Sequence, residues 1–181
     1  MSHWRHAVGT SLKAFELEDE YGLWNGSYQI ETLQYISDRI CRYYDVPIVD
    51  VEISNRLKGR TWGNYTKRSG KIRISRFHRK LALIIHEVCH HITGMETKSA
   101  GHHAGFKKRH ETLIREFVSG RFGFFQDDLP AINTLNWYRI NRKRLFDALR
   151  PKNENDLVLI QKLNRHGLNY LPEGDERLLR I

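Results

Sequence analysis

The chain has 181 residues, of which 40% are hydrophobic and 28% charged, which is enough to fold one domain with a short extension but too short for two full domains. Its formal net charge of +9 favours polyanionic partners. No apolar run approaches the roughly 20 residues of a membrane-spanning helix, and the first residues lack the apolar stretch of a secretory signal. Two cysteines cannot form a disulfide framework. We therefore expect a cytoplasmic protein, or one of the nucleoid or nucleus if it acts on DNA.

The first half of the chain shows one helical and one strand pattern. Residues 1–26 have no clear hydrophobic period, so we expect a loosely structured lead-in. A helix should follow, with Ser27 as its N-cap and apolar residues at helical spacing as far as residue 44. Alternation of apolar and acidic residues over 49–53 predicts a strand with one buried face.

Residues 56–80 contain ten basic and no acidic side chains. Strands at about residues 60–66 and 71–75 flank Lys67-Arg68-Ser69-Gly70, a sequence typical of a hairpin turn. Ile72 and Ile74 should face the core, while the basic residues between them face solvent. This segment can be interpreted as a surface that tracks phosphates and stacks on bases, or as an ordinary solvated hairpin. The candidate nucleic-acid-binding residues are Arg60, Lys67, Arg68, Lys71 and Arg73.

Three more helices are predicted after the hairpin. The first begins near residue 81, is apolar over more than half its circumference and should lie in the core, with Gly94 placed to end it. An amphipathic helix at about 106–117 ends by Gly120, and a basic helix covers 134–149. The fold class is therefore α+β with a small antiparallel sheet. The main domain should span residues 27–120, and residues 121–181 should form a helical extension packed on it.

A metal-binding motif lies within the predicted core helix, where residues 86–90 read His-Glu-Val-Cys-His, an H-E-x-x-H pattern. Residues four apart lie one turn apart on the same face, so His86 and His90 can present ring nitrogens to one ion. Zinc held by three protein ligands keeps a position for water and lowers its pKa to about 7. Glu87, about 100° around the helix, can accept a proton from this water and deliver one to a leaving amine. The motif predicts Zn²⁺ with Glu87 as the catalytic residue.

The third zinc ligand must come from outside the motif. Thr93 and Glu96 stand where the long metzincin pattern requires glycine and histidine, so that lineage is excluded. The remaining candidates are His102 and His103, in a polar connection that can fold back over the metal, and Glu111, inside the next helix. His91 and His110 are expected to pack beside the site rather than to bind the ion.

The order helix, strand, basic hairpin and H-E-x-x-H helix, followed by the segment Gly-His-His-Ala-Gly-Phe at 101–106, resembles the SprT-like zinc metallopeptidases of Spartan type over about residues 27–120. That resemblance implies a zincin-like catalytic domain, and it implies His102 as the third ligand, by counting back from Phe106. His103 departs from the family pattern, in which glycine is usual. The resemblance also implies a protease that acts on proteins crosslinked to DNA, although the cysteine zinc ribbon of many relatives is missing here.

The leading hypothesis is a zinc metalloendopeptidase whose substrate is protein, with single-stranded or duplex DNA as a partner through the basic hairpin. One alternative is a regulatory protease that cuts a single dedicated partner, such as a repressor. Another is a nucleic-acid-binding protein in which the zinc is structural and nothing is cleaved. An open coordination position and an activity that depends on Glu87 distinguish the enzyme from the binding protein.

Overall fold

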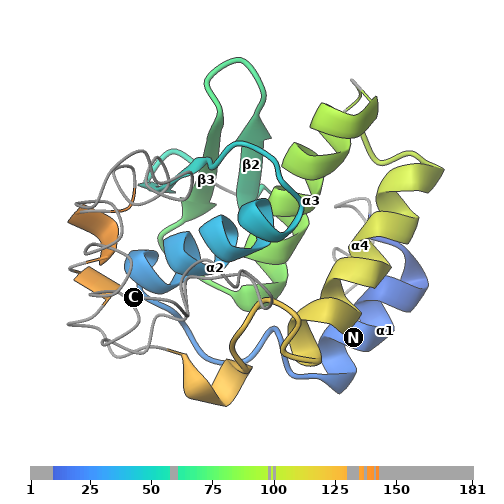
Figure 1. The fold of residues 1–181 in the computed structure, drawn as a ribbon, viewed down its shortest axis with the longest axis horizontal. Coiled ribbons are helices and arrows are strands. Elements are labelled where there is room, and N and C mark those ends of the chain that lie inside the picture. Colours follow the sequence, from blue (N-terminus) through green and yellow to red (C-terminus); the bar gives the residue numbers. More distant parts are fainter. Residues whose placement is uncertain are drawn as a thin grey trace, which may run out of the picture. The chain divides into compact units, whose positions relative to one another are not determined.

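The computed structural model describes residues 10–57, 61–97, 99, 101–129, 135, 136, 138–140 and 142. Contacts divide the chain into two compact units, Met1–Asp128 and Leu129–Ile181. The first unit is α+β, as predicted, and Figure 1 shows its arrangement. Its elements are α1 (Leu12–Glu20), α2 (Ile30–Tyr43), β1 (Asp50–Ser54), β2 (Gly63–Thr66), β3 (Lys71–Ser75), α3 (Leu81–Thr97), α4 (Ala104–Val118) and a short 3-10 turn (Gln126–Asp128).

The three strands form a mixed sheet in the order β1-β3-β2. β2 and β3 pair antiparallel as a hairpin, and Gly70 in its turn has a φ of +57°, which glycine adopts without strain. β1 pairs with β3 in parallel, so the predicted antiparallel sheet is wrong at this pairing. The alternation in residues 49–53 specifies which face of the strand is buried, but it does not specify the direction of the neighbouring strand.

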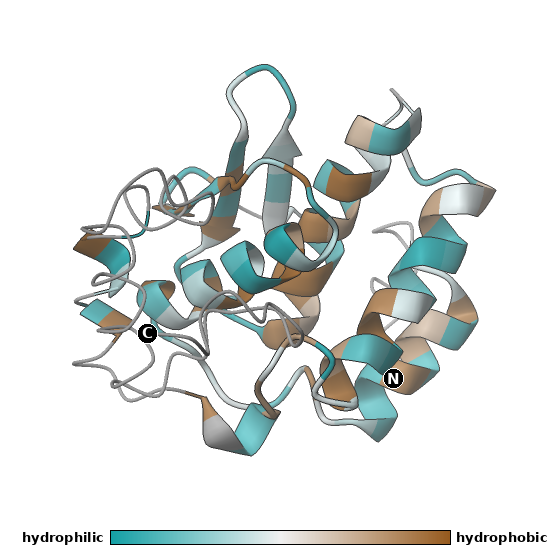
Figure 2. Cartoon of the chain, in the orientation of Figure 1, coloured by the Kyte–Doolittle hydropathy of each residue, from teal (hydrophilic) through white to brown (hydrophobic). Residues whose placement is uncertain are grey.

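The core lies between one face of the sheet and the helices α2 and α3, which contact each other and the strands. Ile72 and Ile74 are fully buried on this face, as predicted. Every residue of α3 from Leu81 to Gly94 is buried, and Figure 2 shows this helix as mostly hydrophobic. The prediction that Gly94 ends the helix is wrong, because α3 continues to Thr97, whose hydroxyl donates to the Thr93 carbonyl at 2.7 Å.

The N-terminal segment contains a helix that the sequence analysis did not predict. Ser11 is the N-cap of α1, and its hydroxyl accepts a hydrogen bond from the Ala14 N–H at 3.1 Å. The expectation of a loosely structured lead-in is therefore wrong over Leu12–Glu20. This helix packs on α4. It was missed because it is short and because its buried side includes Glu18 beside the apolar residues.

Two other predictions concern helix boundaries and the second unit. α2 begins after Gln29 rather than after Ser27, and the Gln29 side chain makes no capping hydrogen bond. Within the predicted helix 134–149, the six described residues are all helical, and the remainder lies outside the described residues, as does the apolar run 157–160. Among the helices that the structure describes, none combines the length and apolar character needed to cross a bilayer.

Candidate metal centre

Three histidines converge from the middle of α3 and from the end of the connection to α4. His86 and His90 lie one turn apart on α3, and their Nε2 atoms are 3.2 Å apart. His102, just before α4, places its Nε2 3.2 Å from that of His86. The potential ligand atoms of all three residues lie within 4.8 Å of one another. The structure therefore brings together the two motif histidines and the third histidine that the sequence suggested, in a group that could hold a metal ion.

The two separations from His86 fit a tetrahedral ion. Zinc–nitrogen bonds of about 2.0–2.1 Å in a tetrahedron put neighbouring nitrogens about 3.3 Å apart, close to the two 3.2 Å separations. The charge state also fits. Burial, followed by the neighbouring His110, His90 and His102, holds the pKa of His86 well below its usual value, and burial also lowers the pKa of His102. Both rings are thus neutral near pH 7, and neutral imidazole is the form that binds metals.

Phe106 on α4 fixes the three rings against one another. It is fully buried and stacks on His90 with ring centroids 4.3 Å apart and planes 26° apart. Its edge-to-face contacts with His86 and His102 have centroid separations of 5.2 and 4.9 Å. His86 and His90 are buried whereas His102 is exposed, so the group opens to solvent on the side of His102.

Glu87 lies about 100° around α3 from His86 and faces the edge strand β2. It is buried, and burial raises the pKa of its carboxyl to about 8, with a smaller opposing effect from a backbone hydrogen bond with Tyr65. β2 approaches it very closely at Gly63, where an added Cβ would lie 2.5 Å from Glu87 Oε1. Gly63 and Tyr65 thus line the carboxylate. Sequence reasoning missed both roles, because nothing in the sequence shows that β2 is the strand next to α3.

The two alternative ligands serve other purposes. His103 is the N-cap of α4, and its Nδ1 accepts a hydrogen bond from the Phe106 N–H at 3.2 Å. Glu111 accepts a hydrogen bond from the Ser11 hydroxyl at 2.7 Å, which ties α4 to the start of α1. Neither residue belongs to the group of three histidines found among the described residues.

The candidate nucleic-acid-binding residues do not form one free basic surface, because several of them contact other parts of the protein. Lys67 donates to the Gly94 carbonyl at 3.1 Å, at the far end of α3. Lys71 forms an ion pair with Glu52 on β1, and Arg73 Nε lies 3.7 Å from the same carboxylate. Arg68 is exposed in the hairpin turn, and Arg60 lies outside the described residues. The sequence could not show the acidic partner, because Glu52 faces these residues only through the parallel register of β1 and β3.

The aromatic residues of the basic segment also differ in accessibility. Trp62 stacks on His78 with centroids 3.7 Å apart, and the hydroxyl of Tyr65 lies 3.0 Å from His91 Nδ1. Phe77 is 70% exposed, with the Arg76 guanidinium over its ring. Of the three aromatic residues in this segment, Phe77 is therefore the one whose ring is most open to a stacking base.

No family model, curated protein or solved structure matches the chain. The functional argument therefore rests on the side chains described above.

Proposed function

We propose that this protein is a zinc-dependent metalloendopeptidase with a zincin-like, SprT-like catalytic domain. In this proposal, His86, His90 and His102 hold the metal, and Glu87 is the general base and acid. The observation that supports it best is the convergence of three imidazoles among the described residues, with two nitrogen separations of 3.2 Å that match a tetrahedral ion. Structural zinc sites usually have four protein ligands, so three ligands favour catalysis over the alternative of a structural zinc.

The donor set favours zinc among the common divalent ions, because imidazole nitrogens in a tetrahedral arrangement suit Zn²⁺ better than Mg²⁺ or Ca²⁺. When bound, Zn²⁺ would supply Lewis-acid chemistry, polarising a substrate carbonyl and making water more acidic. The exposed side of the group, at His102, gives a peptide access to this position.

Glu87 has the properties required for the proton transfers of peptide hydrolysis. Its carboxylate would take a proton from the attacking water and pass it to the nitrogen of the leaving amine. A pKa raised to about 8 by burial allows the carboxyl to hold that proton near neutral pH, and the positive charge of a bound ion would lower this value toward neutrality. The hydrogen bond with the Tyr65 backbone and the close approach of Gly63 fix the position of the carboxylate between these two steps.

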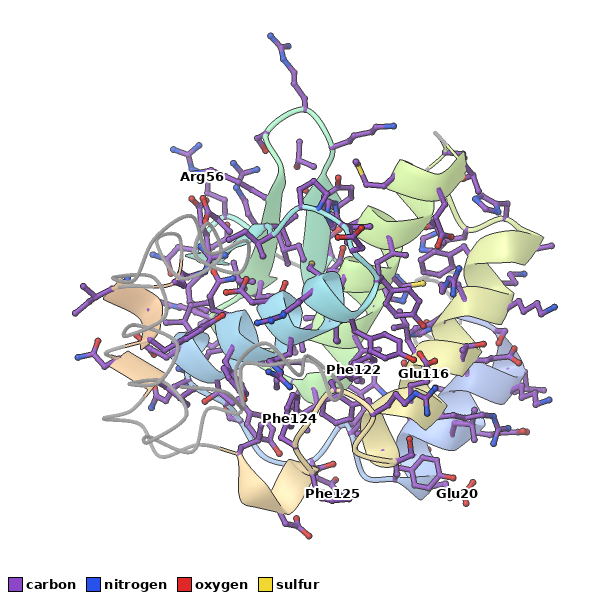
Figure 3. All side chains as sticks on the ribbon, viewed as in Figure 1. Glu20, Arg56, Glu116, Phe122, Phe124 and Phe125 are labelled. Carbon is purple, nitrogen blue, oxygen red and sulfur yellow. The ribbon has the colours of Figure 1, made fainter. Side chains whose placement is uncertain are left out.

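We further propose that the substrates are proteins associated with DNA. The net charge of +9 and the exposed Arg68 in the hairpin turn support this part of the proposal, as does the exposed Arg56, which is labelled in Figure 3. The ion pairs of Lys71 and Arg73 with Glu52 reduce the charge available to phosphates, so Arg68 should contribute more to binding than either of them. A regulatory protease with one dedicated partner would need no such surface.

The decisive experiment compares the wild-type protein with Glu87→Gln for zinc content after dialysis and for cleavage of a test protein, with and without single-stranded DNA. Glu87→Gln should keep zinc and lose cleavage by a factor of about 10² or more, the usual contribution of a general acid–base group. If the variant cleaves as fast as wild type, Glu87 is not the proton carrier. If neither protein cleaves and both hold zinc, the structural role is the better assignment. DNA binding should weaken steeply with salt, and a flat salt response would contradict the DNA partner.

A further inference from the structure

Two ionisable side chains that the proposed chemistry does not use are buried behind the metal centre. Glu18 on α1 is 1% exposed and His110 on α4 is fully buried, and His110 Nε2 lies 3.4 Å from Glu18 Oε1. The indole N–H of Trp24 donates to the other carboxylate oxygen at 2.8 Å. Removing a carboxylate and an imidazole from water costs several kcal/mol, and apolar residues could pack these two helices without that cost. The pair therefore needs an explanation other than helix packing.

The metal centre provides one, because His110 lies directly against it. The ring of His110 is perpendicular to that of His86, with an interplanar angle of 89° and centroids 5.0 Å apart. It also contacts Phe106, which stacks on His90. A displacement of His110 would therefore be transmitted to both motif histidines. His110 thus contacts Glu18 through its Nε2 atom and His86 through its ring, so it links α1 to the motif histidine.

The start of α1 makes further polar contacts with residues at or near the metal centre. Thr10 Oγ1 lies 3.5 Å from His86 Nδ1, and Ser11 donates to Glu111 on α4. Polar contacts thus attach α1 both near its first turn and near its last turn to the residues around the metal centre. Three neutral imidazoles contribute no negative charge to balance a dication, which an ionised carboxylate at Glu18 would supply.

We propose that Glu18 and His110 are positioning residues of the metal centre. Glu18 holds His110, His110 fixes the orientation of the His86 ring, and the charge of Glu18 favours a bound dication. This inference rests on the proposed metal site. It assigns α1 a role in metal affinity rather than in packing alone. It predicts that neutralising Glu18 weakens metal binding while the polypeptide remains folded.

The test measures the metal affinity of the full chain by competition with a chelator, using Zn²⁺ alone, and records the visible absorption spectrum after Co²⁺ substitution. Glu18→Gln keeps the shape of the side chain and removes its charge. We expect Zn²⁺ affinity to fall by about tenfold, the lower end of the range for outer partners of metal ligands, and the Co²⁺ bands to shift. The matched control is Glu20→Gln, which removes an exposed carboxylate of the same helix and should change neither quantity (Figure 3).

A second variant covers the case in which Glu18→Gln does not fold. The double variant Glu18→Leu, His110→Phe replaces both members of the pair by apolar side chains of similar size, a change that is often neutral or stabilising. If it folds by circular dichroism and binds Zn²⁺ ten times or more weakly, the inference stands. If either folded variant binds Zn²⁺ as tightly as wild type, with unchanged Co²⁺ bands, the pair is only structural and the inference is wrong. Failure of the wild-type protein itself to bind Zn²⁺ would instead overturn the proposed function.

Discussion

Gly63→Ala tests whether the edge strand positions the Glu87 carboxylate, which we propose to be catalytic. The added Cβ would lie 2.5 Å from Glu87 Oε1, 2.9 Å from Leu83 Cδ1 and 3.0 Å from Glu87 Cδ. Reaching an ordinary contact of 3.4 Å requires the methyl group and the carboxylate oxygen to separate by about 0.9 Å. Because a misplacement of about 1 Å in an active site can reduce the rate by about 10²-fold, we expect kcat to fall by about that factor. Stability should fall by about 1–3 kcal/mol, as is usual when a packed site receives an extra methyl group.

The assay follows proteolysis and zinc content together. The three atoms nearest to the added Cβ belong to Glu87 and Leu83 and not to the histidines, so Gly63→Ala should retain zinc while losing cleavage. Asn64→Ala is the matched control, because Asn64 is the next residue of β2 and is exposed. Cleavage by Gly63→Ala at the wild-type rate would refute the reasoning that contact with β2 fixes the carboxylate. Loss of zinc in the same variant would show that the strand supports the ligands rather than the base.

Two more predictions concern the ligands and pH. His102→Ala should lose zinc on dialysis, whereas His103→Ala should keep it and lose about 1 kcal/mol of stability with the helix cap; retention by the first variant or loss by the second would reverse their roles. Burial, followed by His90 and His102, lowers the pKa of His110 to about 3, so the metal-free folded state binds fewer protons than the unfolded state below pH 6.5. Its stability should therefore fall by at least about 1 kcal/mol between pH 7.5 and 5.5 in urea unfolding, and an unchanged midpoint would contradict the burial of neutral imidazole.

The parts of the fold that follow from short-range patterns could be predicted from the sequence. The hairpin strand at Lys71–Ser75 and the core position of α3 agree with the structure, because alternation and helical period report directly on which face is buried. The pair His86 and His90 also depends on one helical turn alone. These features require no knowledge of which elements are neighbours.

The features that could not be predicted depend on contacts between elements far apart in the chain. The parallel pairing of β1 and β3 and the ion pair of Glu52 with Lys71 arise from topology, which the alternation does not encode. Gly63 approaches Glu87 only because β2 is the strand nearest to that part of α3. α1 was missed because a buried glutamate interrupts its apolar face, and that glutamate has a partner 92 residues further along, His110.

The adjacent histidines before α4 have different roles: His103 caps the helix, and His102 belongs to the metal centre. Since His103 caps the helix by itself, α4 can begin at the same residue whether or not an ion is present. His102 is then held at the rim of the centre before any metal arrives, and little backbone freedom remains to be lost on uptake. Metal exchange should accordingly be a local event at one solvent-facing imidazole, and loss of the ion should leave the secondary structure of the domain in place.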